Sequence, residues 1–193
     1  MQLKKFFLLM IITTISFLIV ATGNNSILPG KIENFKLKDY NGKEHSLSDY
    51  KDSKAIIIIF VATECPVSNA YNSRMENLFK DYSERDIAFI GINSNKAESA
   101  DRIKEHAKEN GLTFTILKDE KNIIADKFEA SFTPEVYVLN NNFDILYHGR
   151  IDNSKKESEV VTKDLENALE EILAGKEVSK KETKAFGCTI KRI

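Results

Sequence analysis

The sequence predicts an α/β domain with a central mixed β-sheet flanked by helices. Two uninterrupted apolar runs, AIIIIFV at residues 55–61 and IAFIGI at residues 87–92, predict strands that are buried on both faces. The stretch between them has apolar residues at helical spacing, so we expect two parallel strands joined by a helical crossover. A later pair of short alternating runs predicts an antiparallel hairpin, which makes the sheet mixed.

The first 23 residues have the pattern of a secretory signal peptide. Lys4 and Lys5 are followed by an apolar run at residues 6–20 and by small residues at positions 21–23. We therefore expect cleavage after Gly23 and a periplasmic or secreted protein; an uncleaved leader would act as a membrane anchor. The rest of the chain carries no second apolar run of this kind.

The charge balance and the cysteine count exclude several classes of protein. The formal net charge is −1, and loss of Lys4 and Lys5 with the leader would make it −3, which is not the footprint of a nucleic-acid-binding protein. Only two cysteines, Cys65 and Cys188, are present, too few for a disulfide scaffold. With three scattered histidines they also predict no metal site, and no cofactor is expected.

The N-terminal half of the mature chain supplies the first elements. Alternating residues on both sides of Asn41-Gly42 predict a β-hairpin before the first buried strand. After that strand, Thr63-Glu64-Cys65 leads into a helix that we expect to run unbroken from Pro66 to about Tyr82, with Pro66 in the first helical position.

The C-terminal half supplies the others. We expect a turn at residues 93–95, a helix at 99–110, a strand at 114–117, a short helix at 122–128, hairpin strands at 135–139 and 145–147, and an amphipathic helix at 160–174. The apolar stripe of the last helix should include both Val161 and Leu165.

The predicted domain therefore covers residues 24–175, and residues 176–193 form a basic, flexible tail that carries Cys188. This order of elements is similar to that of the thioredoxin fold, with an N-terminal hairpin extension and a C-terminal tail.

Cys65 is the leading candidate for a reactive residue. It lies where a buried strand meets a helix, and the free N–H groups of a helix start stabilise a thiolate. Thr63 and Ser68 are near enough in sequence to hydrogen-bond the sulfur. Two alternatives remain at this point: an inert buried cysteine, and a purely structural Cys65–Cys188 disulfide.

Three further segments are candidates for a supporting role. Thr133-Pro134 directly precedes a strand, where it forms either a tight turn beside Cys65 or the plain start of an edge strand. Cys188 follows Gly187 in the tail and is a candidate resolving thiol, or a thiol with no partner. We interpret His148 as a solvated residue at the edge of the sheet, and Arg150 with Asp152 as a structural ion pair.

Seven segments together resemble the peroxiredoxin-like redoxins, which are related to the alkyl hydroperoxide reductase/thiol-specific antioxidant group of the thioredoxin superfamily. These segments are FVATECPVSNAY (60–71), GINSN (91–95), LKDE (117–120), TPEVYVL (133–139), YHGRID (147–152), DLENALEEILAGK (164–176) and GCTIKR (187–192). The resemblance implies a redox-active cysteine at Cys65, a cis-proline at Pro134 and a C-terminal Gly187-Cys188 step.

The sequence departs from the related families at two places. A peroxiredoxin has Pro-x-x-x-Thr/Ser-x-x-Cys and an active-site arginine before the late strand, whereas Ile58, Ala62 and Thr133 occupy the corresponding positions here. A thioredoxin-type reductase has Cys-x-x-Cys, and the second cysteine is replaced by Ser68. The sequence therefore lacks part of the peroxiredoxin motif and also part of the motif of a thioredoxin-type disulfide reductase.

The leading prediction is an exported thiol oxidoreductase. Cys65 would react with a hydroperoxide or a protein disulfide, Cys188 would resolve the product, and an external thiol or thioredoxin-type donor would reduce the protein again. The alternatives are a thioredoxin-type exchange protein, a non-enzymatic redox sensor or client-binding protein, and a copper carrier.

Overall fold

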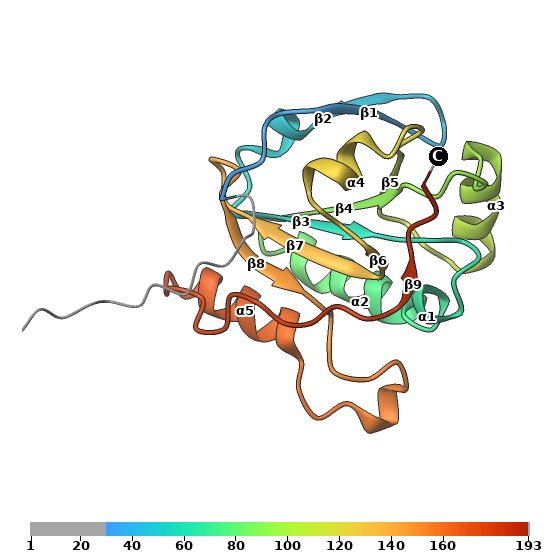
Figure 1. Cartoon of the computed structure of the whole chain (residues 1–193). Coiled ribbons are helices and arrows are strands. Elements are labelled where there is room, and N and C mark those ends of the chain that lie inside the picture. Colours follow the sequence, from blue (N-terminus) through green and yellow to red (C-terminus); the bar gives the residue numbers. More distant parts are fainter. Residues whose placement is uncertain (1–29, 193) are drawn as a thin grey trace, which may run out of the picture.

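The computed structural model describes residues 30–192 as one α/β unit built around a seven-stranded mixed sheet. The strand order is β2-β1-β5-β4-β3-β7-β8, and a separate two-stranded sheet pairs β6 with β9 (Figure 1). The predicted leader, residues 1–23, lies outside the described residues. Among residues 30–192 no helix has both the length and the apolar character needed to cross a membrane.

The two apolar runs form the centre of the sheet as predicted. Strands β3 (Ala55–Phe60) and β4 (Ile87–Asn93) pair in parallel, and β4 pairs in parallel with β5 (Thr115–Lys118). Every residue of β3 is buried, and alternate side chains enter two different cores. Ile57 and Ile59 pack with the helices α2 (Asn72–Ser83), α3 (Ala100–Glu109) and α5 (Asp164–Leu173) on one face. Ile56 and Ile58 pack with α4 (Ile123–Lys127) on the other.

The predicted hairpin at Asn41-Gly42 is confirmed. It joins β1 (Lys36–Asp39) to β2 (Glu44–Ser46), and β1 also pairs antiparallel with β5, so the hairpin extends one edge of the sheet. A 3₁₀ turn, η1 (Leu47–Tyr50), then leads towards β3.

The helix expected at 66–82 is two helices. The short helix α1 (Pro66–Asn69) ends at Ala70, and α2 (Asn72–Ser83) begins one residue later. At the break, the N–H of Tyr71 bonds the carbonyl of Ser68, three residues back, so the α-helical pattern stops there. The free N–H groups expected to stabilise a thiolate at Cys65 therefore belong to a single helical turn, α1, and not to one long helix.

The segment that follows agrees with the predicted order except for one additional short strand, β6. Helix α3 (Ala100–Glu109) is capped by the Ser99 side chain, and α4 (Ile123–Lys127) follows β5. Strand β6 (Phe132–Thr133) leads into the antiparallel pair β7 (Glu135–Leu139) and β8 (Ile145–Gly149), and β7 pairs antiparallel with β3.

The last helix begins later than predicted. Helix α5 (Asp164–Leu173) starts four residues after Val160, and a 3₁₀ turn, η2 (Glu157–Glu159), precedes it. The Asn153 side chain accepts hydrogen bonds from the N–H groups of Val161 and Thr162, which holds that segment in a loop. Val161 is consequently 83% exposed and does not belong to the buried stripe, whereas Leu165 is fully buried.

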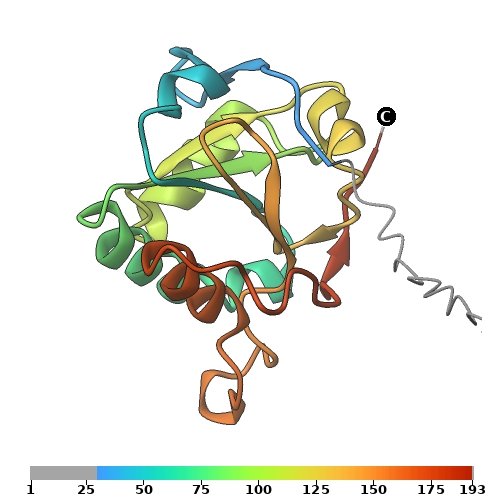
Figure 2. The ribbon, with the colours of Figure 1, turned by 90° about the vertical axis from the view of Figure 1, so that its left-hand side faces the viewer.

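The C-terminal segment, expected to be a flexible tail, docks along the domain (Figures 1 and 2). Main-chain bonds join His148 of the edge strand β8 to Lys181 and Thr183, and β9 (Cys188–Thr189) then pairs antiparallel with β6. The buried residues that anchor it are Val178, Ala185 and Ile190. The tail therefore crosses from α5 to the end of the sheet where Cys65 lies.

Candidate active site

Cys65 lies at the N-terminal end of α1, directly after the loop that follows β3. It is the N-cap residue of α1, and the Ser68 N–H donates a hydrogen bond to its sulfur over 3.3 Å. On the other side the thiol donates to the carbonyl oxygen of Thr133, also over 3.3 Å. Only 3% of Cys65 is exposed, so the sulfur is held between α1 and β6.

The second thiol approaches from the tail. In the β6–β9 pair Cys188 lies opposite Thr133, and Phe132 lies opposite Thr189. The close packing depends on Gly187, because a Cβ atom there would lie 2.0 Å from the carbonyl oxygen of Thr133. The Gly-Cys step thus has a geometric reason: a larger residue would push Cys188 away from Cys65.

The two thiols shift each other's pKa in opposite directions. Burial raises the pKa of Cys65, but hydrogen bonds that the Cys188 thiol, the Ser68 N–H and the Thr133 hydroxyl can donate to the thiolate outweigh burial, and the net pKa is lowered. Burial and the neighbouring Cys65 sulfur raise the pKa of Cys188. Cys65 is therefore the group that ionises first, and Cys188 keeps its proton as a donor.

The loop before Cys65 is fixed by a buried carboxylate. Glu98 is 4% exposed and accepts hydrogen bonds from the N–H groups of Thr63 and Glu64, over 2.6 and 3.3 Å. The Asn93 side-chain amide donates to the same carboxylate over 2.6 Å. Glu98 therefore links the end of β4 to the residues that position Cys65.

The loop between β4 and α3, which contains Glu98, also contacts the tail. The Lys191 N–H donates to the Asn95 side chain over 2.9 Å, and the Lys96 N–H donates to the carbonyl of Lys191 over 2.9 Å. The buried Lys118 ammonium donates a hydrogen bond to the carbonyl of Asn95 over 2.7 Å and so joins this loop to β5.

These segments enclose a pocket of about 220 Å³ beside the sulfur of Cys65. Its lining includes Cys65, Glu98, Thr133, Cys188 and Lys191. The Thr133 hydroxyl is buried and has no hydrogen-bond partner in the thiol form among residues 30–192, so it is free to donate to a thiolate or to a small bound molecule. Lys191 supplies the positive charge at this pocket.

The other residues predicted to support the site lie near Cys65, but Ser68 contacts the sulfur through its main chain and not through its hydroxyl. The Thr133–Pro134 peptide bond is cis, as the resemblance implies, and Pro66 is the first residue of α1. Ser68 contacts the sulfur through its N–H, while its hydroxyl accepts a bond from the Ala62 N–H. The buried Thr63 hydroxyl has no partner within the described part of the chain.

The roles suggested for His148 and Arg150 were wrong. The His148 ring is 2.7 Å from the Glu135 carboxylate and stacks on Tyr137, so it is packed rather than solvated. Arg150 pairs with Asp164 over 2.7 Å, whereas Asp152 pairs with Arg74 over 2.5 Å. The partners of His148, Arg150 and Asp152 all lie more than ten residues away in the sequence, so they could not be inferred from neighbouring residues.

Two residues that hold the candidate site in place carry no local pattern that would have identified them. Glu98 reads as an ordinary acid before a helix, yet it is the buried acceptor for the Cys65 loop. Glu135 accepts the N–H groups of Ser131 and Phe132 and so holds β6 in place. The GINSN motif was the one available sign that the loop after β4 matters.

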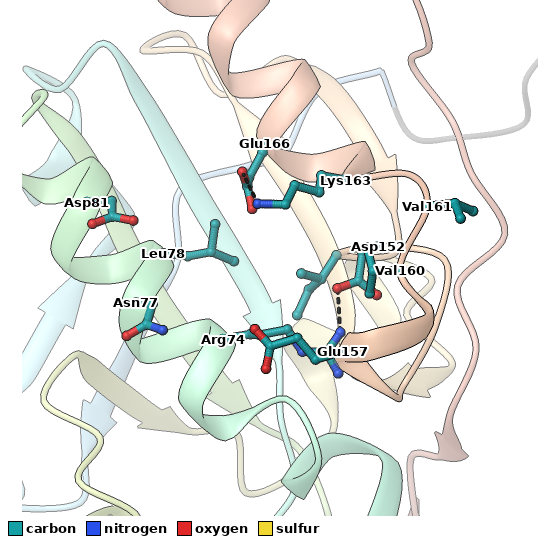
Figure 3. Close-up of a pocket in the computed structure, with 11 residues that line it drawn as sticks. Arg74, Asn77, Leu78, Asp81, Asp152, Glu157, Val160, Val161, Lys163 and Glu166 are labelled. Carbon is teal, nitrogen blue, oxygen red and sulfur yellow. Dashed lines mark hydrogen bonds and ion pairs between the residues drawn. The ribbon is translucent and has the colours of Figure 1, made fainter.

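A larger pocket, about 440 Å³, lies between α2, α5 and the segment between β8 and α5 (Figure 3). Its charged side chains are largely paired with each other: Arg74 contacts Asp152, and Lys163 contacts Glu166. No cysteine lines it. Within residues 30–192 no group of three or more His, Cys, Asp or Glu side chains could hold a metal ion.

Comparison with known families matches residues 29–154 to the AhpC/TSA family. Among curated proteins, the chain is 30% identical over 139 residues to peroxiredoxin Q of Oryza sativa, covering 65% of this chain and 63% of that protein. It is 27% identical over 122 residues to the thiol-disulfide oxidoreductase ResA of Bacillus subtilis, and this match covers 63% of this chain and 66% of that protein. The chain thus spans less than two thirds of the length of these relatives.

Among solved structures, a hypothetical protein from Sinorhizobium meliloti superposes with a TM-score of 0.80 at 29% identity. The match covers 86% of this chain and 94% of that protein. Its coverage is higher than that of the two curated relatives, so the similarity extends over most of the described fold.

Proposed function

Because the chain belongs to the AhpC/TSA family, we propose that it is an exported thiol oxidoreductase in which Cys65 is the nucleophile and Cys188 the resolving thiol. The observation that carries the proposal is the pair of thiols held together by the β6–β9 pairing, with the pKa of Cys65 lowered and that of Cys188 raised. A two-cysteine cycle needs a thiolate that attacks the oxidant and a second thiol that loses its proton and attacks the oxidised sulfur.

With a hydroperoxide the cycle balances as follows. The Cys65 thiolate attacks the distal oxygen, the O–O bond breaks, and the alkoxide that leaves takes up a proton, so that Cys65 becomes a sulfenic acid. The Cys188 thiol then attacks the Cys65 sulfur, a disulfide forms and water leaves. Lys191, which lines the pocket, is the cation available to stabilise the departing oxygen.

With a disulfide the same residues act by exchange. The Cys65 thiolate attacks one sulfur of the substrate and expels the other as a thiolate, and Cys188 then releases the mixed disulfide. The pairing of β9 with β6 serves this chemistry as it serves the first, because it brings Cys188 to the Cys65 site for the release step. An external thiol or a thioredoxin-type donor closes either cycle.

The experiment compares the two oxidants on the reduced protein without its leader. Hydrogen peroxide and a small disulfide are each added at one equivalent, and the loss of free thiols is followed in time for wild type, Cys65→Ser and Cys188→Ser. The proposal predicts that Cys65→Ser abolishes the reaction, and that Cys188→Ser stops it at a sulfenic acid or a mixed disulfide. Equal oxidation of Cys65→Ser and wild type would refute the assignment of the nucleophile.

The export part of the proposal has its own test. Expression of the full chain with a C-terminal tag should give a product shortened after Gly23 and found outside the cytoplasm. A product of full length in the cytoplasm would contradict it.

A further inference from the structure

We propose that residues 187–190, termed here the strap, set the substrate selectivity of Cys65. The strap occupies in cis the strand-pairing edge of β6, so small oxidants reach Cys65 directly, whereas an extended polypeptide disulfide reaches it only after the strap is released. The inference rests on the proposed function of Cys65 and adds to it the class of substrate that the resting protein accepts.

The first observation is that β6 has β9 as its partner and is otherwise outside the main sheet. Thr133 pairs with Cys188 and Phe132 with Thr189 in an antiparallel ladder. An unpaired strand edge is where an extended peptide adds to a protein by main-chain hydrogen bonds. A polypeptide that brings its sulfur to Cys65 along this edge needs the groups of Phe132 and Thr133 that the strap already uses.

The second observation is how firmly the strap is attached. The Ile190 N–H donates to the carbonyl of Ser131 over 2.9 Å, and the Ile190 side chain is 5% exposed within the core on the α4 face of the sheet. Directly after it, Lys191 exchanges hydrogen bonds with Asn95 and Lys96. A competing peptide must displace all of these contacts together.

The third observation is the size of the remaining opening. With the strap in place, Cys65 is 3% exposed and the pocket beside it measures about 220 Å³. This volume lies below the range of roughly 300–1,000 Å³ of pockets that enclose drug-sized ligands. This volume suits a hydroperoxide or a small disulfide better than a polypeptide chain.

Gly187 offers a way to release the strap without removing a thiol or a charge. A Cβ atom at this position would lie 2.0 Å from the carbonyl oxygen of Thr133, so Gly187→Ala is incompatible with the pairing of β6 and β9. Gly30→Ala is the matched control, because a Cβ atom there meets no other atom within 4 Å.

The test measures attack by Cys65 on two disulfides that share one leaving group. The first is mercaptoethanol joined to thionitrobenzoate, and the second is a short extended peptide whose central cysteine carries thionitrobenzoate. The Cys65 thiolate forms a new S–S bond with the mercaptoethanol or peptide sulfur, and the coloured thionitrobenzoate anion leaves with the electron pair. Both substitutions are made in the Cys188→Ser background so that the mixed disulfide accumulates and can be counted by intact mass.

With Gly30→Ala we expect a fast reaction with the small disulfide and a slow one with the peptide. With Gly187→Ala the ratio of the peptide rate to the small-disulfide rate should rise at least about tenfold over that in Gly30→Ala, because only the peptide needs the released state. Loss of the donor at residue 188 changes the pKa of Cys65 and therefore affects both rates alike, so it cancels in the ratio. Equal changes in the rates with both reagents, or no change in either rate, would overturn the proposed role of the strap. If Cys65 reacts with neither reagent in any variant, the proposed nucleophile itself fails, and the strap with it.

Circular dichroism and urea unfolding show whether Gly187→Ala keeps its fold. If it does not, Ile190→Ala takes its place, since it removes the buried anchor of the strap and leaves Gly187 unchanged. Its expected effect has the same direction, a rise in the ratio of the peptide rate to the small-disulfide rate, and an unchanged ratio would again overturn the proposal.

Discussion

At the scale of single residues, the thiolate of Cys65 is stabilised by donors that come from three separate segments. The Ser68 N–H belongs to α1, the Thr133 hydroxyl to β6 and the Cys188 thiol to the tail. Burial alone would raise the pKa of Cys65, and these donors reverse the direction. The reactivity of this thiol therefore depends on the tail as well as on its own loop.

Removing the thiol of Cys188 should raise the pKa of Cys65. Cys188→Ala deletes one of the donors to the Cys65 sulfur, whereas the Cys188→Ser control retains a hydroxyl donor. The pH dependence of iodoacetamide alkylation at Cys65, read by mass, gives the pKa in each variant. A pKa in Cys188→Ala equal to or lower than that of wild type would show that Cys188 does not stabilise the thiolate.

Truncation of Glu98 should destabilise the protein well beyond an ordinary surface change. Glu98→Ala leaves the N–H groups of Thr63 and Glu64 and the Asn93 amide without their acceptor, which we expect to cost roughly 3 kcal/mol. The exposed neighbour Glu64 is the control, and Glu64→Ala should change stability by less than about 0.5 kcal/mol. Urea unfolding measures both, and similar effects would contradict the role of Glu98.

Local pattern was sufficient to place Cys65 and Pro66 where a buried strand meets a helix, whereas the cis bond at Thr133-Pro134 was expected mainly from the family resemblance. It was insufficient for Glu98, because burial of that carboxylate results from the Cys65 loop folding over it. A single acid before a helix looks the same in sequence whether it is solvated or buried.

At the scale of elements, β6 is held in place by one buried carboxylate. Glu135 accepts the N–H groups of Ser131 and Phe132 over 2.7 and 2.8 Å, and it contacts His148 over 2.7 Å. Burial raises the pKa of Glu135, but the hydrogen bond from His148 and the two N–H groups lower it below its ordinary value of 4.5. The strand that carries Thr133 therefore depends on an ionised Glu135.

We predict that the stabilisation from Glu135 is lost in acid. A carboxyl whose pKa is lowered by folding contributes its stability above its ordinary pKa, and the contribution falls as the pH drops through the folded-state pKa. At neutral pH Glu135→Gln should be about 2 kcal/mol less stable than wild type. Urea unfolding at falling pH should show this difference shrinking below pH 4.5. A difference that stays constant or grows in acid would contradict the assignment.

Element boundaries show where sequence patterns stop being informative. Continuous burial made β3 and β4 predictable almost to the residue. The start of α5 was misplaced because the Asn153 side chain holds Val161 and Thr162 in a loop, and a side chain eight residues away has no periodic signal. The break between α1 and α2 was missed for a similar reason, since apolar spacing continues across it.

At the scale of the whole molecule, the order of strands and helices could be predicted, but the path of the tail could not. Its anchors, Val178, Ala185 and Ile190, follow neither a helical nor a strand period. Each enters a site formed by other elements, so burial of the tail appears only once the sheet and its helices are assembled. The same docking brings two cysteines that are distant in sequence into one pocket.

The central claim is that Cys65 and Cys188 are one redox pair within a single chain. The most direct test is to oxidise the reduced protein with one equivalent of hydrogen peroxide, digest it without reduction and identify the cross-linked peptides. The account predicts one intramolecular disulfide that joins Cys65 to Cys188, with an intact mass lower by two hydrogens. A disulfide between two chains, or an oxidised Cys65 beside a free Cys188, would contradict it.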